Sequence, residues 1–232
     1  MGLPGSLERL LGDERIALLR EVVLMPHDLS ESVPEGCAAE DVVVLVHGFL
    51  ASAGVFRPLR ARIEREAGAR VATFTHAPGV RVRTIAEHLA RLVDRLPRAA
   101  RVTVVGHSIG GLAARWYVQE LGGHARVART ISLASPFGGL DVPPVLVGAD
   151  LRTQSTILER IRSRAHVHEV PHTSIVGAAD TLVPGVETAC LGFGDVVVLQ
   201  ERGHNGLLFC DRAAAVVIDR TKALRTETRR RF

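Results

Sequence analysis

The residues with the clearest chemical signal are a serine and the glycines around it. The run Gly106-His107-Ser108-Ile109-Gly110-Gly111 matches the pattern G-x-S-x-G. It follows the apolar stretch Val102 to Val105 and opens a helical pattern, so Ser108 stands at a turn from a strand into a helix. Such a turn projects the serine hydroxyl above the sheet, and glycines on both sides permit the close backbone approach that it needs. Ser108 is therefore the predicted nucleophile.

A serine hydroxyl needs a base that accepts its proton, and the base needs an acid that fixes its tautomer. His204 and Asp180 each lie in a loop after a predicted strand, and they follow Ser108 in the order Ser, Asp, His. Of the ten histidines, only His204 combines this order with this position. The competing acids are Glu187, Asp195 and Asp150. The first lies further along its loop and the second precedes its strand, so we expect Asp180 to orient the base His204.

A tetrahedral intermediate also needs backbone N–H donors for its oxyanion. One donor is expected from Ile109, the residue after the nucleophile. The second is expected from Phe49 in the run His47-Gly48-Phe49, which directly follows the first buried strand. We expect His47 to hold this loop through hydrogen bonds of its side chain.

Short apolar runs alternate with helical patterns along the chain, which predicts a mostly parallel sheet covered by helices on both faces. The predicted strands are 42–46, 70–75, 101–105, 127–133, 172–176 and 196–199. The predicted helices are 6–20, 56–67, 83–96, 108–121, 153–164, 205–210 and 213–225. The first of these helices reads as amphipathic, with leucines at positions 7, 10, 11, 18 and 19 near helical spacing.

Composition narrows the class of protein. The 232 residues are 47% hydrophobic, enough for one sizeable core. The sequence has 29 basic and 25 acidic residues, and the arginines are spread among Glu and Asp along the helical stretches, which argues against nucleic acid as a partner. Three scattered cysteines indicate neither a disulfide framework nor a metal site. The only basic cluster, 225–231, is interpreted as a frayed tail.

The sequence also gives an expectation for the location of the protein. Residues 1–20 carry several charges and no uninterrupted apolar core of a secretory signal. No stretch reaches the roughly 18 apolar residues of a membrane span. We therefore expect a cytoplasmic protein without stable insertion into a membrane, and the sequence leaves the oligomeric state open.

Together these motifs resemble the α/β-hydrolase superfamily, and within it the lipase and esterase branch of small bacterial triacylglycerol-lipase type. The resemblance covers roughly Asp41 to Cys210 and includes the run Ala134-Ser135-Pro136-Phe137-Gly138-Gly139 after the fourth strand, where family lipases often carry His in place of Phe137. It implies one α/β-hydrolase domain over 1–232, with Ser108, Asp180 and His204 as the triad. Only 140–170 could serve as a lid, and this stretch is short.

The expected activity is hydrolysis of carboxylic esters of apolar acyl groups through an acyl-enzyme on Ser108, with a small-molecule ester or lipid as substrate. The residues expected to line the acyl pocket are Leu50, Phe137, Leu140, Leu182, Val183 and Leu207. Such a site favours neutral, short to medium acyl chains. A thioesterase, acyltransferase or peptidase on the same triad remains an alternative, as does a binding module without catalysis. Neither a cofactor nor a metal is expected.

Overall fold

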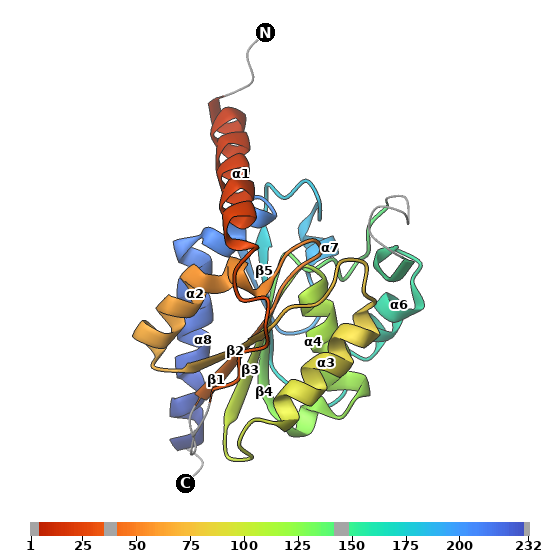
Figure 1. Cartoon of the computed structure of the whole chain (residues 1–232). Helices are drawn as coiled ribbons and strands as arrows, with labels where there is room; N and C mark the ends of the chain where they lie inside the picture. Colours follow the sequence, from red (N-terminus) through yellow and green to blue (C-terminus); the bar gives the residue numbers. More distant parts are fainter. Residues whose placement is uncertain (1–4, 35–40, 142–148, 230–232) are drawn as a thin grey trace.

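The computed structural model describes residues 5–34, 41–141 and 149–229. Within them, six parallel strands form one sheet in the order β2-β1-β3-β4-β5-β6 (Figure 1). The strands are β1 (Asp41–Val46), β2 (Arg70–Phe74), β3 (Arg101–His107), β4 (Val127–Leu133), β5 (His172–Gly177) and β6 (Asp195–Leu199). The predicted sheet, mostly parallel and covered on both faces, is confirmed.

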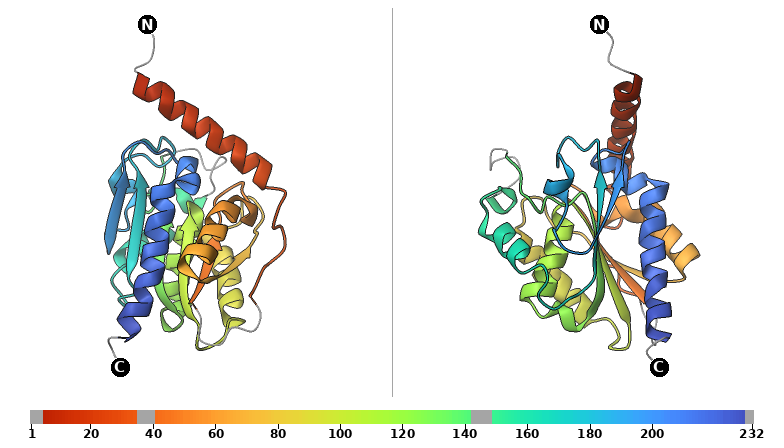
Figure 2. Two further views of the ribbon diagram at one scale, coloured as in Figure 1. Left: turned by 90° about the vertical axis from the view of Figure 1, so that its left-hand side faces the viewer. Right: turned by 180° about the vertical axis from the view of Figure 1, so that it is seen from behind.

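Alternate residues of the central strands face opposite layers of helices, as the period of two along a strand requires. Val42, Val44 and Val46 of β1 pack in a core cluster with α3 (Val82–Asp94), α4 (Ile109–Glu120) and α6 (Thr156–Ser163). Val43 and Leu45 pack on the opposite face. Helices α2 (Arg57–Arg62) and α8 (Asp211–Arg229) cover that face (Figures 1 and 2). The continuous valine run of β1 therefore reflects burial on both sides.

Short turns complete the fold. The predicted helix 56–67 is divided into a 3₁₀ turn η1 (Ala53–Phe56), α2 and a π-helical turn η2 (Ile63–Ala67). The other short elements are η3 (Gly123–Ala125), η4 (Ala149–Leu151), α7 (Val186–Ala189) and η5 (Asn205–Phe209). In the described part of the chain, no helix combines the length and the apolar character needed to cross a membrane.

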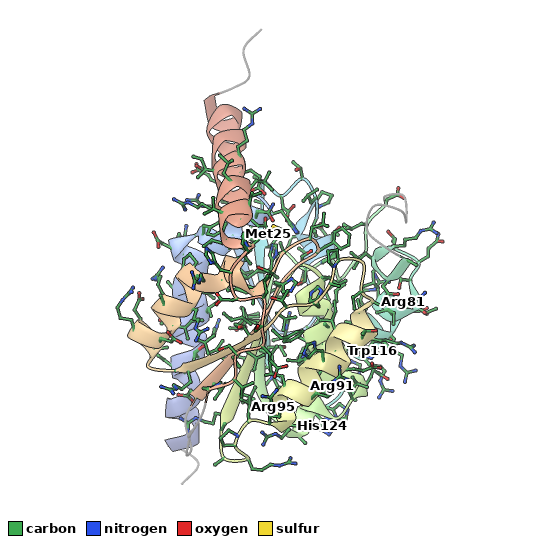
Figure 3. All side chains as sticks on the ribbon, in the orientation of Figure 1. Met25, Arg81, Arg91, Arg95, Trp116 and His124 are labelled. Atoms are coloured by element: carbon green, nitrogen blue, oxygen red, sulfur yellow. The ribbon has the colours of Figure 1, made fainter. Side chains whose placement is uncertain are left out.

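The basic residues are distributed as the sequence indicates. Figure 3 shows Arg81, Arg91 and Arg95 along α3 and its ends, rather than gathered in one groove. Arg95 pairs with Glu31, so part of this positive charge is matched locally. Arg115 of α4 is fully buried, and its guanidinium donates to the carbonyls of Ala165 and Val170 at 2.8 and 3.2 Å. Burial lowers the pKa of Arg115 to about 10.

Helix α1 (Gly5–Leu24) lies across the edge of the sheet at which the strands end (Figure 2). The predicted helix is present, and of the five leucines that predicted its amphipathic character, Leu18 and Leu19 have described side chains. From residue 12 onward, the buried side chains of α1 are Ala17 and Glu21, with 3% and 8% of their surface exposed. Leu18 and Leu19 remain 46% and 67% exposed. The side chains that this part of α1 buries are therefore a small residue and an acid, and its exposed side chains include the apolar Ile16, Leu19 and Val23.

Candidate active site

Ser108 sits at a strained turn between β3 and α4. Its backbone has φ 52° and ψ −121°, a left-handed conformation that a non-glycine residue rarely adopts. Glycines are needed on both sides because the backbone passes very close. A Cβ on Gly106 would lie 2.2 Å from the nitrogen of Gly111, and a Cβ on Gly110 would lie 2.2 Å from the carbonyl oxygen of Val46. The strain at Ser108 and the missing side chains beside it are the geometry of a nucleophile elbow.

His204 and Asp180 form a buried pair beside this turn. The Nδ1–H of His204 donates to Oδ2 of Asp180 at 2.8 Å, and the two side chains are 9% and 1% exposed. The other oxygen of Asp180 accepts the backbone N–H groups of Leu182 and Val183, both at 2.8 Å. These bonds fix the carboxylate, which in turn fixes the imidazole tautomer. The Nε2 lone pair of His204 is thus left free to accept a proton.

Two further contacts hold the base in place. The loop of Asp180 is tied to the loop of His204 by the N–H of Ala179, which donates to the carbonyl of Arg202 at 3.2 Å. The ring of His107, next to Ser108, lies 4.8 Å from the ring of His204 and donates through Nε2 to the His204 carbonyl at 3.2 Å. Burial holds the pKa of His107 well below its usual value, so this ring is neutral. The sequence analysis did not identify His107.

The loop after β1 meets the serine directly. A Cβ on Gly48 would lie 3.2 Å from the Cβ of Ser108, so only a glycine lets this backbone pass. The side-chain bonds expected for His47 are present: His76 donates its N–H to His47 Nε2 at 3.0 Å, and His47 Nδ1–H donates to the Gly48 carbonyl at 2.8 Å. Burial, then the neighbouring His76, lowers the pKa of His47 to about 3. A neutral, fixed His47 therefore presents Phe49 beside the serine.

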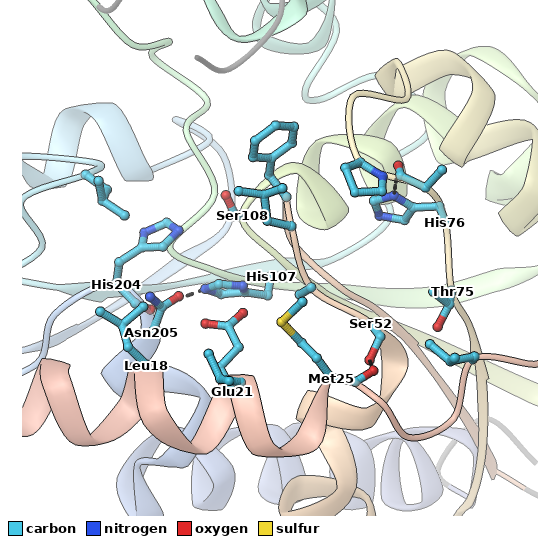
Figure 4. A pocket seen from close by; sticks show the side chains of 18 residues that line it. Leu18, Glu21, Met25, Ser52, Thr75, His76, His107, Ser108, His204 and Asn205 are labelled. Atoms are coloured by element: carbon cyan, nitrogen blue, oxygen red, sulfur yellow. Dashed lines mark hydrogen bonds between the residues drawn. The ribbon is translucent and has the colours of Figure 1, made fainter.

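A pocket of about 750 Å³ opens over these residues (Figure 4). Its lining is mostly apolar and includes Ser108, His204 and three of the other sequence-predicted residues. The lining also includes Leu18, Glu21, Met25, Phe49, Leu50 and Leu182. In Figure 4 the hydroxyl of Ser108 points to the side on which the His204 ring lies. The structure thus brings together the predicted nucleophile and base with Phe49, Leu50 and Leu182.

The other four predicted pocket residues do not line this pocket. Phe137 is fully buried and packs edge-on against His172, with the ring centroids 5.5 Å apart. Val183 and Leu207 are each 1% exposed and belong to core clusters. Leu140 pairs with Leu151 through its backbone and packs on the core. Proximity in sequence to a site residue did not decide where these side chains point.

The lid prediction falls in part on residues 142–148, which lie outside the described residues. In the described remainder, Ile157, Leu158 and Ile161 of α6 are core residues packed beside α4. The pocket has a different cover, which the sequence analysis missed. Helix α1 and the turn after it contribute Leu18, Glu21 and Met25 to the lining.

Glu14 joins α1 to the loop of the base. Its carboxylate accepts the N–H groups of Asn205 and Gly206 at 2.7 and 3.1 Å, at the start of η5 and directly after His204. A Cβ on Gly203 would lie 2.4 Å from this carboxylate, so a glycine makes room for it. An available signal was the repeat of acids at positions 14 and 21, seven apart and therefore on one helix face.

Comparison with solved structures supports the fold. A monoacylglycerol lipase from Paleococcus ferrophilus has a TM-score of 0.63 at 17% identity over 78% of this chain and 94% of its own. The mature lipase BlEst2 from Bacillus licheniformis has a TM-score of 0.63 at 14% identity over 82% and 95%. Est1E from Butyrivibrio proteoclasticus has a TM-score of 0.56 at 16% identity over 86% and 91%. No curated protein matches the chain.

Fold and site together define an α/β hydrolase, as the resemblance to the lipase and esterase branch implied. Residues 42–179, more than half of the chain, match the model of one family within this class. The chain belongs to the palmitoyl protein thioesterase family and is a hydrolase of the lipase, esterase and thioesterase type. The match ends one residue before Asp180, so Asp180, His204 and helix α1 lie outside it.

Proposed function

We propose that the protein is a serine hydrolase that cleaves carboxylic esters of apolar acyl groups through an acyl-enzyme on Ser108. The observation that carries the proposal is the buried 2.8 Å bond to Asp180 from His204, which lines the same pocket as the strained Ser108. An activated serine needs a base with a fixed tautomer, and this bond supplies it.

The proposed reaction has two halves. The Ser108 oxygen attacks the ester carbonyl while His204 takes the hydroxyl proton. The oxyanion receives the N–H groups of Ile109 and Phe49, which are donors in this proposal because one opens α4 and the other follows Gly48 beside the serine. His204 then gives its proton to the leaving alcohol as the C–O bond breaks. Water repeats the sequence on the acyl-enzyme and releases the acid.

The apolar lining supports a neutral acyl group. Phe49, Leu50 and Leu182 surround the serine side of the pocket, and a charged acyl group would lose its hydration there. Each methylene buried from water contributes at most about 0.8 kcal/mol, or about fourfold in kcat/KM. We expect the gain to stop at short to medium chains.

Thioesters of longer acids are the second candidate substrates, because the chain belongs to the palmitoyl protein thioesterase family. The same triad serves both reactions, since only the leaving atom differs. The acyl-chain dependence separates the two candidates. A rate that climbs steeply to the longest thioesters favours the family reaction.

The test is a panel of p-nitrophenyl esters and acyl thioesters of increasing length, measured on the wild type and on Ser108→Ala. Ser108→Ala should lower turnover about 10⁴-fold to 10⁶-fold. Ser163→Ala is the matched control, since Ser163 is an exposed residue of α6 away from the pocket. A Ser108→Ala protein with near wild-type turnover contradicts the proposal.

A further inference from the structure

Helix α1 places one carboxylate inside the pocket. Glu21 is 8% exposed and lines the same cavity as Ser108 and His204. Figure 4 shows its side chain rising from α1 into the pocket toward His107. Among the described residues that line this cavity, Glu21 is the one acid. The apolar site expected from the sequence therefore contains one strong hydrogen-bond acceptor.

Among the residues that the structure describes, none donates a hydrogen bond to this carboxylate. Its oxygens are not sealed from solvent, so they open onto the pocket and can accept a hydrogen bond from a group that enters it. Burial is the main cause that raises the pKa of Glu21 to about 7, with Glu14 adding to it and His204 opposing it. The side chain is thus held near the point at which it gains or loses its charge.

The position of Glu21 relative to the reaction follows from His204. Glu21 interacts electrostatically with His204, the proposed donor of the proton to the leaving group. The leaving oxygen must lie beside His204 when the C–O bond breaks. The acyl carbonyl lies at the other side of Ser108, against the loop of Gly48 and Phe49. Glu21 therefore faces the alcohol part of the ester.

We propose that Glu21 is a specificity-determining residue that accepts a hydrogen bond from a hydroxyl group in the alcohol part of the substrate. The preferred substrates are then esters of an apolar acid with a polyol, rather than with a simple alkanol. This inference rests on the proposed function and names the substrate class of that same site. A hydroxyl fits better than an ammonium group, because the cation that forms on His204 during the reaction would repel a second positive charge.

The test compares two esters of butanoic acid that differ only in the alcohol, propyl butanoate and 2,3-dihydroxypropyl butanoate. The readout is the ratio of their kcat/KM values. Differences in enzyme concentration or in the state of His204 affect both esters equally, so they cancel in this ratio. One hydrogen bond to a charged acceptor predicts a wild-type preference of about 10-fold to 100-fold for the dihydroxypropyl ester. Glu21→Leu should bring this ratio to about 1. Glu21→Gln, which keeps an acceptor without the charge, should give an intermediate ratio.

The matched control is Asp13→Asn, an exposed acid of α1 that pairs with Arg202 outside the pocket. It should keep the wild-type ratio. The wild-type preference should also increase as the pH rises through about 7, and this increase should vanish in Glu21→Gln. The titratable groups that act on Glu21 are His204 and Glu14. In Glu21→Gln the side chain at position 21 is uncharged at every pH, so neither group can alter the ratio through the charge of that side chain.

Every outcome decides the inference. Cleavage of p-nitrophenyl butanoate by the wild type but not by Ser108→Ala establishes the proposed function independently of the alcohol. If that activity is present, a wild-type ratio near 1, or a Glu21→Leu ratio equal to the wild-type ratio, overturns the role of Glu21. If that activity is absent, the proposed function fails and the inference fails with it.

Discussion

Replacement of Glu14 by alanine measures how firmly α1 holds the loop of the base. The carboxylate accepts two backbone N–H groups, those of Asn205 and Gly206, in a half-buried contact. In Glu14→Ala both donors lose this partner, and water replaces it only in part. Because His204 immediately precedes them, the loss should affect both stability and catalysis.

The magnitude follows from the contacts. A hydrogen bond to a charged group contributes about 1.5 to 3 kcal/mol when buried, and solvent around a half-buried carboxylate reduces each of these two bonds to about 1 kcal/mol. Glu14→Ala should therefore lower the free energy of unfolding by about 2 kcal/mol. Glu14→Gln keeps one acceptor oxygen without the charge and should cost about half as much.

The assays are urea unfolding and the kcat for p-nitrophenyl butanoate. We expect kcat to fall about 10-fold in Glu14→Ala, because a small displacement of the base lengthens the proton transfer from Ser108. Asp13→Asn is the control, since its ion pair with Arg202 is 51% and 38% exposed and should contribute less than about 0.5 kcal/mol. Equal effects of Glu14→Ala and Asp13→Asn on unfolding and on kcat would refute the reasoning.

Three other substitutions follow from the geometry. Asp180→Asn should preserve folding and lower kcat about 10⁴-fold, because an amide favours the wrong tautomer of the base, whereas Glu187→Gln should be mild; the opposite pattern in ester assays would reassign the acid. Gly110→Ala should lower the melting temperature or prevent folding, since its Cβ would meet the carbonyl of Val46 at 2.2 Å, and an unchanged melting curve would contradict this. Burial raises the pKa of Glu21 from 4.5 to about 7, so the native state binds a proton that the unfolded state has lost, and stability falls as the pH rises between these values. Urea unfolding of the wild type and of Glu21→Gln at about pH 5 and about pH 8 tests this. The free energy of unfolding of Glu21→Gln relative to the wild type should be higher by about 1 to 2 kcal/mol at the higher pH, after allowance for partial solvent access. A difference that does not depend on pH would argue against the reasoning.

The residues proposed for chemistry could be predicted because each leaves a local signature. Ser108 lies in a short pattern of glycines that the turn itself requires, as the close contact at Gly110 shows. Asp180 and His204 lie in loops at the ends of strands, and parallel strands bring those ends to one edge of the sheet. Position along the chain was therefore enough to place them together.

The cover of the pocket could not be predicted in the same way. The leucines of α1 indicated an amphipathic helix but not which residues would be buried, and Glu21 is 8% exposed while Leu19 is 67% exposed. The carboxylate of Glu14 links the helix to two backbone N–H groups of another loop. Since every residue except proline has a backbone N–H, such a contact requires no particular residue type in that loop and leaves no sequence pattern there. Phe137 shows a related limit. It follows the end of β4 as predicted, but its side chain is buried in the core.

Helix α1 also has a consequence for how this enzyme class can diversify. The sheet, the nucleophile elbow and the loop of the base are built from residues after position 41, whereas the wall that carries Glu21 comes from a segment before the first strand. That wall is held by Glu14 on the backbone after His204, by the ion pair of Asp13 with Arg202 and by the Ser52 hydroxyl, which donates to the Met25 carbonyl. If Glu21 has the role proposed above, exchange of this one segment for a helix with another residue at position 21 alters which alcohols are accepted, while the residues proposed for ester cleavage stay as they are.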